Sequence, residues 1–332
     1  MKPCIALLTG GYSGEAEVSY ATAITIEKNI DREKYDCYKI DITRTDWCYE
    51  DENGQKTSVN KNDFSIILQN KKINFDAALI SIHGTPGEDG KMQGYLDMIG
   101  VPYTSCNAAT SAITFNKRYT IAVAGAAGIN VSPSVLLFKK ERNNADKIQA
   151  LKKLNLPVFV KPNNGGSSIG MSKVSNSDHL MAAIDKAFNE DDQVLVEEFI
   201  PGREFTVGVY KKNNETVALP ITEIISKNEF FDFEAKYKGA SDEITPAKID
   251  ESLRILVQSE ARKIYGIFNC EGVVRVDFIY NISKRKLFML EVNTVPGQTE
   301  ASLVPQQIRF AGGNLKDFYS ALIEEALSKK ER

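Results

Sequence analysis

Cysteine is scarce in this chain and follows no metal-binding or disulfide pattern. The five cysteines among 332 residues are scattered and odd in number, and none is spaced as C-x-x-C, so the sequence suggests neither a disulfide framework nor a zinc site. A basic excess is also lacking, because 41 Lys and Arg stand against 44 Asp and Glu for a net charge of −3, so no nucleic-acid partner is expected. Apolar runs such as residues 4–8 are too short for a signal peptide or a membrane span. We therefore expect a cytoplasmic protein that binds neither nucleic acid nor a membrane.

The chain has the length and the apolar content for more than one domain. With 332 residues, 42% of them hydrophobic, it should hold two or three. Strand and helix signals alternate in the first third, which indicates a parallel α/β sheet with right-handed crossovers. The expected elements there are strands at 4–8, 35–42, 75–82 and 101–104 and helices at 16–29 and 92–99.

Two α+β domains are expected to follow, so the predicted domains cover residues 1–106, 107–199 and 200–332. Their expected helices lie at 108–127, 145–154, 177–188 and 251–265. Their expected strands lie at 156–160, 171–174, 193–199, 204–210 and 217–224, besides a hairpin near the C-terminus.

Two glycine-rich loops, residues 10–15 and 83–90, follow expected strands of the first third. Ligands bind at the carboxyl ends of strands in open α/β sheets, so both loops are candidate substrate-binding segments. Residues 10–15 lack the G-x-G-x-x-G spacing of a nicotinamide-binding loop. His83 suits proton handling near neutral pH, or else caps its loop. Glu15 could interact favourably with the dipole of the helix that follows it.

A β-hairpin is predicted near the C-terminus. Residues 272–280 and 286–293 are rich in β-branched, aromatic and aliphatic side chains, and the residues between them, 281–285, form a polar turn. We expect this turn to be centred on Lys284, which sets the pairing of every residue along the two strands.

Four polar side chains should share one face of this hairpin. A turn centred on Lys284 pairs Asp277 with Glu291 and Arg275 with Asn293, and the period of two places all four on the same side. Two facing carboxylates repel each other and need a compensating positive charge. A divalent cation is the natural candidate, since Asp, Glu and Asn oxygens suit Mg²⁺ or Mn²⁺, which share their remaining positions with phosphate groups. The alternative is an exposed face whose charges are solvated.

Residues 161–170 form a glycine-rich segment between the expected strands at 156–160 and 171–174. With no helix after it, the segment is a hairpin flap and not a Walker A loop. Backbone N–H groups, two hydroxyls and a lysine suit a polyphosphate. The alternative is a flexible surface hairpin, but phosphate and a divalent cation are expected together.

Three carboxylates lie at the ends of expected strands. Glu197 and Glu198 end one apolar strand and Glu204 begins the next. A carboxylate there would hold ribose hydroxyls, and the alternative is a set of solvated charges.

Residues 226–245 form a long polar and aromatic segment without a clear period. Such loops are often mobile lids. Lys236 and Tyr237 would reach a site only if this segment folds down over it.

The individual motifs are weak, but their combination and order along nearly the whole chain are specific. The segments are GGYSGEAEVS at 10–19, HGTPGEDG at 83–90, KP at 161–162, GSSIG at 166–170, EFTV at 204–207, EAKY at 234–237, RVD at 275–277, EVNTVPG at 291–297 and SLVP at 302–305. Together they resemble the motifs of the ATP-grasp ligases, and specifically of the D-alanine–D-alanine ligase family.

This resemblance implies an ATP-grasp fold, in which an N-terminal parallel α/β domain precedes two α+β domains that sandwich ATP. It implies that ATP phosphorylates the carboxylate of a first D-alanine and that the amine of a second attacks the D-alanyl phosphate, which yields D-alanyl-D-alanine for peptidoglycan. The family is commonly a homodimer. The alternatives are a D-alanine–D-serine or D-alanine–D-lactate ligase, or a nucleotide-binding protein of this fold without turnover.

The resemblance also assigns residues to three groups. The nucleotide group comprises Lys117, Lys161, Ser167, Ser168, Glu197, Glu198, Ile200, Glu204 and Lys236. The group that handles the substrates comprises Glu15, His83, Ser167, Tyr237, Arg275, Gly297 and Ser302. The metal group comprises Asp277, Glu291 and Asn293, which would hold two Mg²⁺ ions, with Mn²⁺ as a substitute.

Particular roles follow from the same resemblance. Arg275 and the Gly297 N–H would stabilise the oxyanion, and Glu15 would anchor the first ammonium. His83 would lie near the first carboxylate and Ser302 near the second. Glu15, Ser167 and Tyr237 would tie flap, lid and N-terminal domain together.

The lid tyrosine, Tyr237, also bears on the second substrate, because in this family it accompanies peptide-forming ligases and so favours D-alanine over D-lactate. The chain departs from the family pattern at residues 163–165 before the flap serines, and at Val295 and Gln298 around Pro296 and Gly297.

Overall fold

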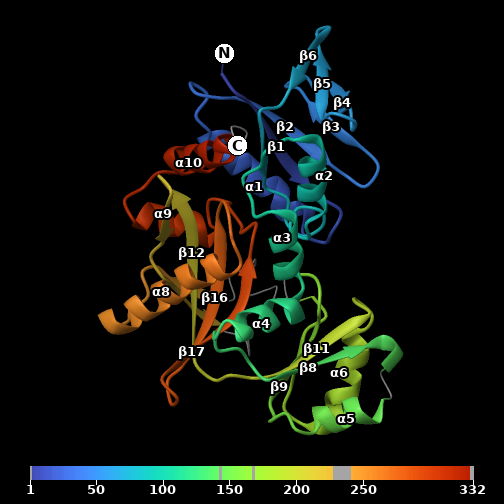
Figure 1. The fold of residues 1–332 in the computed structure, drawn as a ribbon, viewed down its shortest axis with the longest axis vertical. Coiled ribbons are helices and arrows are strands. Elements are labelled where there is room, and N and C mark those ends of the chain that lie inside the picture. The colour runs from blue at the N-terminus through green and yellow to red at the C-terminus, as the bar shows by residue number, and fades with distance from the viewer. Residues whose placement is uncertain (1, 142–143, 167–168, 227–240, 330–332) are drawn as a thin grey trace.

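The computed structural model describes residues 2–141, 144–166, 169–226 and 241–329, and within them the strands form three main sheets and one two-stranded sheet (Figure 1). The three sheets follow one another along the chain, from blue through green to orange in Figure 1. This combination confirms the predicted α/β and α+β class. No helix within the described ranges is long and apolar enough to cross a membrane.

The N-terminal sheet has the order β4-β3-β2-β1-β7. Its elements are β1 (Cys4–Gly10), α1 (Ala16–Asn29), β2 (Asp36–Ile42), β3 (Trp47–Glu50), β4 (Lys56–Ser58), β7 (Ala77–Ile80) and α2 (Lys91–Ile99). The central strand β1 pairs in parallel with β2 and β7, and its residues 5–8 are fully buried, as expected for a strand covered on both faces.

The prediction of a purely parallel sheet was incomplete. Strands β3 and β4 extend it by antiparallel pairing, and β5 (Ser65–Leu68) and β6 (Lys71–Asn74) form the separate two-stranded sheet. All four are short, so their sequences carry little periodic signal. The strand expected at 101–104 is reduced to a bridge between Tyr103 and Ala78.

The central unit begins with two helices, α3 (Ala108–Phe115) and α4 (Lys117–Ala126), where one continuous helix was predicted. Asn116 adopts an extended conformation between them (φ −90°, ψ 105°), and its side chain caps α4. An antiparallel sheet follows, in the order β10-β9-β11-β8. Its elements are β8 (Ser134–Phe138), a short 3₁₀ turn (Lys139–Glu141), α5 (Ala145–Leu151), β9 (Val158–Pro162), β10 (Ser172–Val174), a second 3₁₀ turn (Ser177–His179), α6 (Leu180–Ala187) and β11 (Gln193–Glu198).

The C-terminal sheet is antiparallel, in the order β15-β14-β12-β16-β17, with β13 paired to β12. Its strands are β12 (Arg203–Lys212), β13 (Glu215–Ala218), β14 (Thr222–Ser226), β15 (Ser241–Ile244), β16 (Val274–Asn281) and β17 (Lys286–Asn293). The strand expected at 217–224 is divided in two at Pro220, which cannot donate a ladder hydrogen bond.

Among the described residues, this sheet is accompanied by the helices α8 (Glu251–Ile267), α9 (Leu303–Phe310) and α10 (Leu315–Ser328). Helix α8 packs on the sheet through Leu253, Val257 and Ala261. Helix α10 shares a core with β1 and α1 of the N-terminal unit, and Figure 1 shows it beside them. The last helix therefore binds the C-terminal sheet to the N-terminal one and holds the loops of both at a common centre.

Candidate active site

The hairpin of β16 and β17 presents the predicted polar face. Asp277 pairs with Glu291 and Arg275 with Asn293, so the predicted pairing of these four residues is confirmed. The predicted turn centre at Lys284 is wrong, however, because the register shifts between Asp277 and Phe278, and the strand ends pair Asn281 with Lys286. A β-bulge of this kind re-aims side chains locally.

Arg275 supplies a positive charge to this face. Its Nε and Nη2 donate to the two carboxylate oxygens of Asp277 at 2.9 and 2.7 Å, and Nη2 lies 3.9 Å from Glu291 Oε1. Thr206 Oγ1 donates to Asp277 Oδ1 at 2.5 Å, and Asn293 Nδ2 donates to Asp277 Oδ2 at 3.2 Å. Asp277 is thus surrounded by the guanidinium of its own strand, the hydroxyl of β12 and the amide of β17, and the guanidinium also lies near Glu291.

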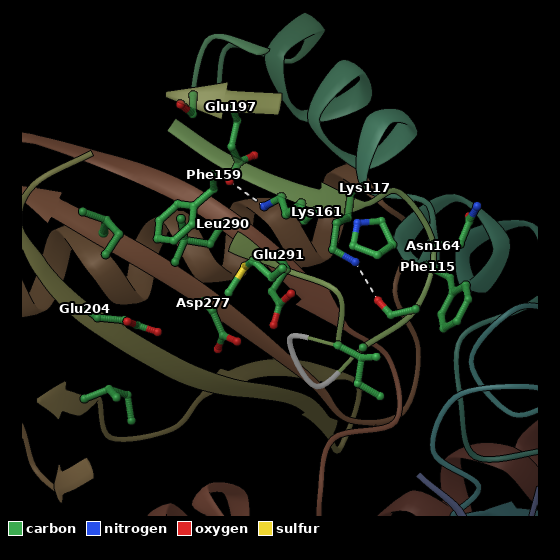
Figure 2. Close-up of a pocket in the computed structure, with 18 of the residues that line it drawn as sticks. Phe115, Lys117, Phe159, Lys161, Asn164, Glu197, Glu204, Asp277, Leu290 and Glu291 are labelled. Carbon is green, nitrogen blue, oxygen red and sulfur yellow. Dashed lines mark hydrogen bonds and ion pairs between the residues drawn. The ribbon is translucent and has the colours of Figure 1, made fainter. Parts of the chain in front are cut away.

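A cavity of about 870 Å³ lies between the central and C-terminal sheets. In Figure 2, Lys161 and Glu197 enter it from the central sheet and Asp277 and Glu291 from the C-terminal sheet. Members of the predicted nucleotide and metal groups among its lining residues are Lys117, Lys161, Glu197, Glu198, Ile200, Glu204, Asp277 and Glu291. Its apolar lining includes Phe159, Ile279 and Leu290, which suits a planar base, while the acids and lysines suit sugar and phosphate.

Lys161 and Glu197 form a buried ion pair in the wall of this cavity, with Nζ 2.5 Å from Oε1. The side chain of Glu198 is tied elsewhere, because it accepts hydrogen bonds from the N and Nδ2 atoms of Asn155 at 2.8 and 2.9 Å. Both hydrogen bonds go to Oε1, which fixes the direction of the Glu198 carboxylate toward Asn155.

The strands that flank the predicted flap, β9 and β10, pair antiparallel, as a hairpin requires, and β9 ends at Pro162 within the predicted segment. Lys117 Nζ donates to Gly165 O at the base of the flap at 2.6 Å (Figure 2). Ser167 and Ser168 of the flap, and Lys236 and Tyr237 of the lid, lie outside the described residues.

A second cavity of about 450 Å³ adjoins the first. Lining residues common to both include Glu15, Lys117, Gly166, Leu290 and Glu291. Predicted residues that line the smaller cavity include His83, Arg275, Asn293, Gly297 and Ser302. All the described residues of the three predicted groups are thus gathered around two adjoining cavities.

Glu15 and Ser302 each lie against a glycine backbone in the smaller cavity. A side chain at Gly166 would meet the Glu15 carboxylate at 2.8 Å, so the flap and the first loop touch there. A side chain at Gly297 would lie 3.0 Å from Ser302 Oγ, and Ser302 Oγ also accepts a hydrogen bond from Thr299 N at 3.0 Å. These glycines allow the carboxylate and the hydroxyl to approach the backbone closely.

His83 is buried, and its Nε2 is hydrogen-bonded to Thr22 Oγ1 at 3.1 Å, while its backbone N donates to Ser19 Oγ at 2.9 Å. Burial lowers the pKa of His83 to about 4, against a smaller opposing effect from its hydrogen bond to the backbone of Val295. The imidazole is therefore neutral at pH 7. The predicted proton handling near neutral pH does not fit this environment, and a neutral group that positions its neighbours does.

This depressed pKa makes stability depend on pH. The unfolded chain takes up a proton on His83 near pH 6.5 and the folded chain only near pH 4, so the free energy of unfolding falls as pH drops through this interval. We expect a loss of up to about 3 kcal/mol between these limits. In urea unfolding measured as a function of pH, the His83→Gln variant should lack this loss of unfolding free energy. The control is His179→Gln, which alters the exposed second histidine, and an unchanged slope in His83→Gln would contradict the assignment.

Glu88 is a residue of the site that the sequence analysis did not single out. Its carboxylate oxygens accept hydrogen bonds from Gly84 N at 2.7 Å and Val295 N at 3.3 Å, and it lines the smaller cavity. Burial, and next the nearby Glu15 carboxylate, raise the pKa of Glu88 well above its usual range. The sequence analysis named the 83–90 loop, which contains Glu88, as a candidate substrate-binding segment. Only the fold shows that Glu88 lies close to Glu15.

The donor set for a divalent cation fits its predicted role. Asp277 and Glu291 line the larger cavity, and Asn293 and Glu291 line the smaller one. Two carboxylates and an amide offer oxygen ligands, as hard cations prefer, and leave positions for phosphate oxygens. The described residues contain no cluster of three or more His, Cys, Asp or Glu suited to a metal, so a cation here would depend on further ligands from water and substrate.

Two antiparallel sheets enclose a cavity that suits a base, a sugar and phosphate groups, and a C-terminal hairpin presents paired carboxylates to it. This combination defines an ATP-grasp ligase. The family model described as "D-ala D-ala ligase N-terminus" matches residues 4–106, and "D-ala D-ala ligase C-terminus" matches residues 123–324. The chain belongs to the D-alanine–D-alanine ligase family.

Similar proteins cover essentially the whole chain. The D-alanine–D-alanine ligase of Azobacteroides pseudotrichonymphae is 46% identical over 321 residues, which are 96% of this chain and 98% of that protein. The corresponding ligase of Bacteroides fragilis is 44% identical over 98% of this chain and 99% of its own length. Among solved structures, the VanG D-Ala:D-Ser ligase of Enterococcus faecalis has a TM-score of 0.87 at 31% identity, covering 98% of this chain and 100% of that one.

Proposed function

We propose that this ATP-dependent ligase joins two D-alanines to D-alanyl-D-alanine, through a D-alanyl phosphate, for peptidoglycan precursors. The observation that carries the proposal is the pair of adjoining cavities. A larger one suits a nucleotide, a smaller one suits two amino acids, and Glu15, Lys117 and Glu291 line both. A phosphoryl group bound at this junction would therefore lie next to a carboxylate in the smaller cavity.

In the first step, a carboxylate oxygen of the first D-alanine attacks the γ-phosphorus, the bond from that phosphorus to the bridging oxygen breaks, and ADP leaves. Lys117, Lys161 and Lys236 neutralise phosphate charge, and the Ser167 and Ser168 hydroxyls of the flap donate hydrogen bonds to phosphate oxygens. Glu197 and Glu204 meet the adenosine moiety, along with the backbone of Glu198 and Ile200. Glu15 anchors the first ammonium group, and neutral His83 lies beside the carboxylate.

In the second step, the amine of the second D-alanine attacks the acyl carbon, inorganic phosphate leaves and the amine loses a proton. Arg275 and the Gly297 N–H face the developing oxyanion, and a donor of this kind contributes about 3 to 4 kcal/mol. Ser302 holds the second carboxylate. Glu15, Ser167 and Tyr237 hold flap and lid over the reacting groups and exclude water, which would otherwise hydrolyse the acyl phosphate.

Asp277, Glu291 and Asn293 would hold two Mg²⁺ ions, or Mn²⁺ in their place. Bound cations would neutralise the β- and γ-phosphate oxygens and polarise the phosphorus that is attacked. The support for this assignment is the oxygen-donor set that faces both cavities.

A second candidate is ligation of D-alanine to D-serine. The observation in its favour is the similarity to the D-Ala:D-Ser ligase, at a TM-score of 0.87 and 31% identity. D-Lactate is less favoured, because the lid carries Tyr237.

The test is phosphate release from ATP with D-alanine, L-alanine, D-serine and D-lactate, supplied singly and in pairs. We expect turnover with D-alanine alone and little with L-alanine. Fragmentation mass spectrometry of the products separates the candidates, because D-alanine with D-serine yields a dipeptide with C-terminal serine only if D-serine is the acceptor. Absence of turnover at millimolar D-alanine would contradict the proposal.

We also propose that the protein works in the cytoplasm, where ATP is available, and that it forms a homodimer. Light scattering at micromolar protein concentration tests the dimer, and a monomeric mass that persists with ATP and D-alanine would exclude it.

A further inference from the structure

Helix α4 begins beside the cavities, and its first turn is capped from a distant part of the chain. The first N–H groups of an α-helix have no partner within the helix. Here Lys117 N donates to Asn163 O at 3.0 Å and Arg118 N to Asn163 Oδ1 at 2.9 Å. Tyr119 N donates to Asn116 Oδ1 at 3.1 Å. Asn163 therefore caps two of these three N–H groups, with its backbone and its side chain.

Asn163 is itself rigidly held. It follows the end of β9 and is fully buried. Its N and Nδ2 donate to the O and Oε1 of Gln193, the first residue of β11, at 2.9 and 3.0 Å. Asn163 thus accepts two hydrogen bonds from α4 and donates two to β11, so four hydrogen bonds link the start of α4 to the central sheet.

Two further contacts join the start of α4 to the flap. Beyond Asn163, the side chain of Asn164 accepts a hydrogen bond from Asn116 Nδ2 at 3.0 Å, and Gly165 O accepts from Lys117 Nζ at 2.6 Å. The direction of the Lys117 side chain is therefore set at both ends, by the cap on its backbone and by the flap on its amine. Lys117 lines both cavities.

We propose that Asn163 is a positioning residue that directs Lys117 at the phosphate groups of the nucleotide. This inference rests on the proposed function, in which Lys117 binds phosphate. Without the Asn163 side chain, the first turn of α4 loses a partner for Arg118 N and is free to rotate or fray. A displacement of about 1 Å is enough to weaken a charge-assisted hydrogen bond severely. Asn163 has no place in the lining of either cavity, so it acts through Lys117.

The test is calorimetric binding of ADP and of adenosine to the full-length protein and its Asn163→Ala variant. ADP contains the phosphates and adenosine does not, so a fault in Lys117 should weaken ADP binding about tenfold and leave adenosine within about twofold. The matched control is Asn144→Ala, since Asn144 caps α5 away from both cavities, and it should change neither affinity.

A double-mutant cycle with Lys117→Ala isolates the route of the effect. If Asn163 acts through Lys117, then Asn163→Ala should cause no further loss of ADP affinity in the Lys117→Ala background. Should Asn163→Ala fail to fold, Gln193→Met provides a milder change, because it removes only the partner of Asn163 Nδ2. It should weaken ADP binding about threefold and leave adenosine binding unchanged.

Each outcome is decisive. Equal losses for ADP and adenosine, no loss for ADP, or additive losses in the cycle would overturn the inference. The proposed function would still stand in any of these cases, provided that the unaltered protein turns over D-alanine and binds ADP more tightly than adenosine. If the unaltered protein binds the two equally, the phosphate role of Lys117 falls, and the inference falls with it.

Discussion

Replacing Glu291 by Gln is expected to leave the protein folded and to reduce metal-dependent turnover about a thousandfold. Glu291 lines both cavities and faces Asp277 across the hairpin. Gln has the same shape but no charge, so it would hold a divalent cation and its phosphate partners poorly. The fold should tolerate the change, because the Glu291 side chain is about one-third exposed and its oxygen lies 3.9 Å from the Arg275 guanidinium.

The measurements are phosphate release over a range of Mg²⁺ concentrations and thermal unfolding. The matched control is Glu215→Gln, which alters an exposed residue of strand β13 in the same sheet and should change neither. If Glu291→Gln kept more than a tenth of the activity at the same Mg²⁺ concentration, the metal site would have been misplaced.

Arg275→Lys should lower kcat about a hundredfold. Lys keeps the positive charge, but it cannot make the two parallel hydrogen bonds that Arg275 makes to Asp277. Its ammonium group would be drawn to Asp277 and lie away from the developing oxyanion. Because an oxyanion contact exists only in the transition state, kcat and kcat/KM should fall together while KM for D-alanine stays constant.

The free energy of unfolding shows whether the loss of kcat comes from the active site or from a destabilised fold. Arg275→Lys should cost less than about 2 kcal/mol, whereas Arg275→Met would leave Asp277 as a buried unpaired carboxylate and cost about 3 kcal/mol or more. The control is Arg254→Lys, which alters an exposed pair with Glu251 on α8 and should leave kcat unchanged. A rise in KM at constant kcat would assign Arg275 to ground-state binding.

The hairpin shows how far local pattern carries a prediction. Alternation fixes which residues share a face, so the pairing of Asp277 with Glu291 follows from the sequence. The bulge next to Asp277 could not be predicted, because it arises from the packing of both strands in a six-stranded sheet.

The helical region after residue 107 shows the opposite case. Its apolar pattern is continuous, and nothing in it marks a break at Asn116 as opposed to a mid-helix asparagine. The break is stabilised by Asn163 and Asn164, which contact Asn116 and Arg118 although they lie more than 40 residues away in the sequence. The short strands β3 and β4 were missed for a related reason, since the pairing of β3 with β2 and of β4 with β3 compensates for weak local preference.

The sequence by itself determined the parts of this protein that depend on composition and local order: the fold class, the flap hairpin, the polar face of the C-terminal hairpin and, through its ordered motifs, the ligase family. Only the tertiary structure decided how those parts act on one another. Burial keeps His83 neutral by lowering its pKa, and the fold places the Glu88 carboxylate near that of Glu15. The Asn163 cap holds the start of α4 at the flap. The reason is physical, since pKa values and cap partners depend on contacts between segments far apart in the chain, and no local pattern encodes them.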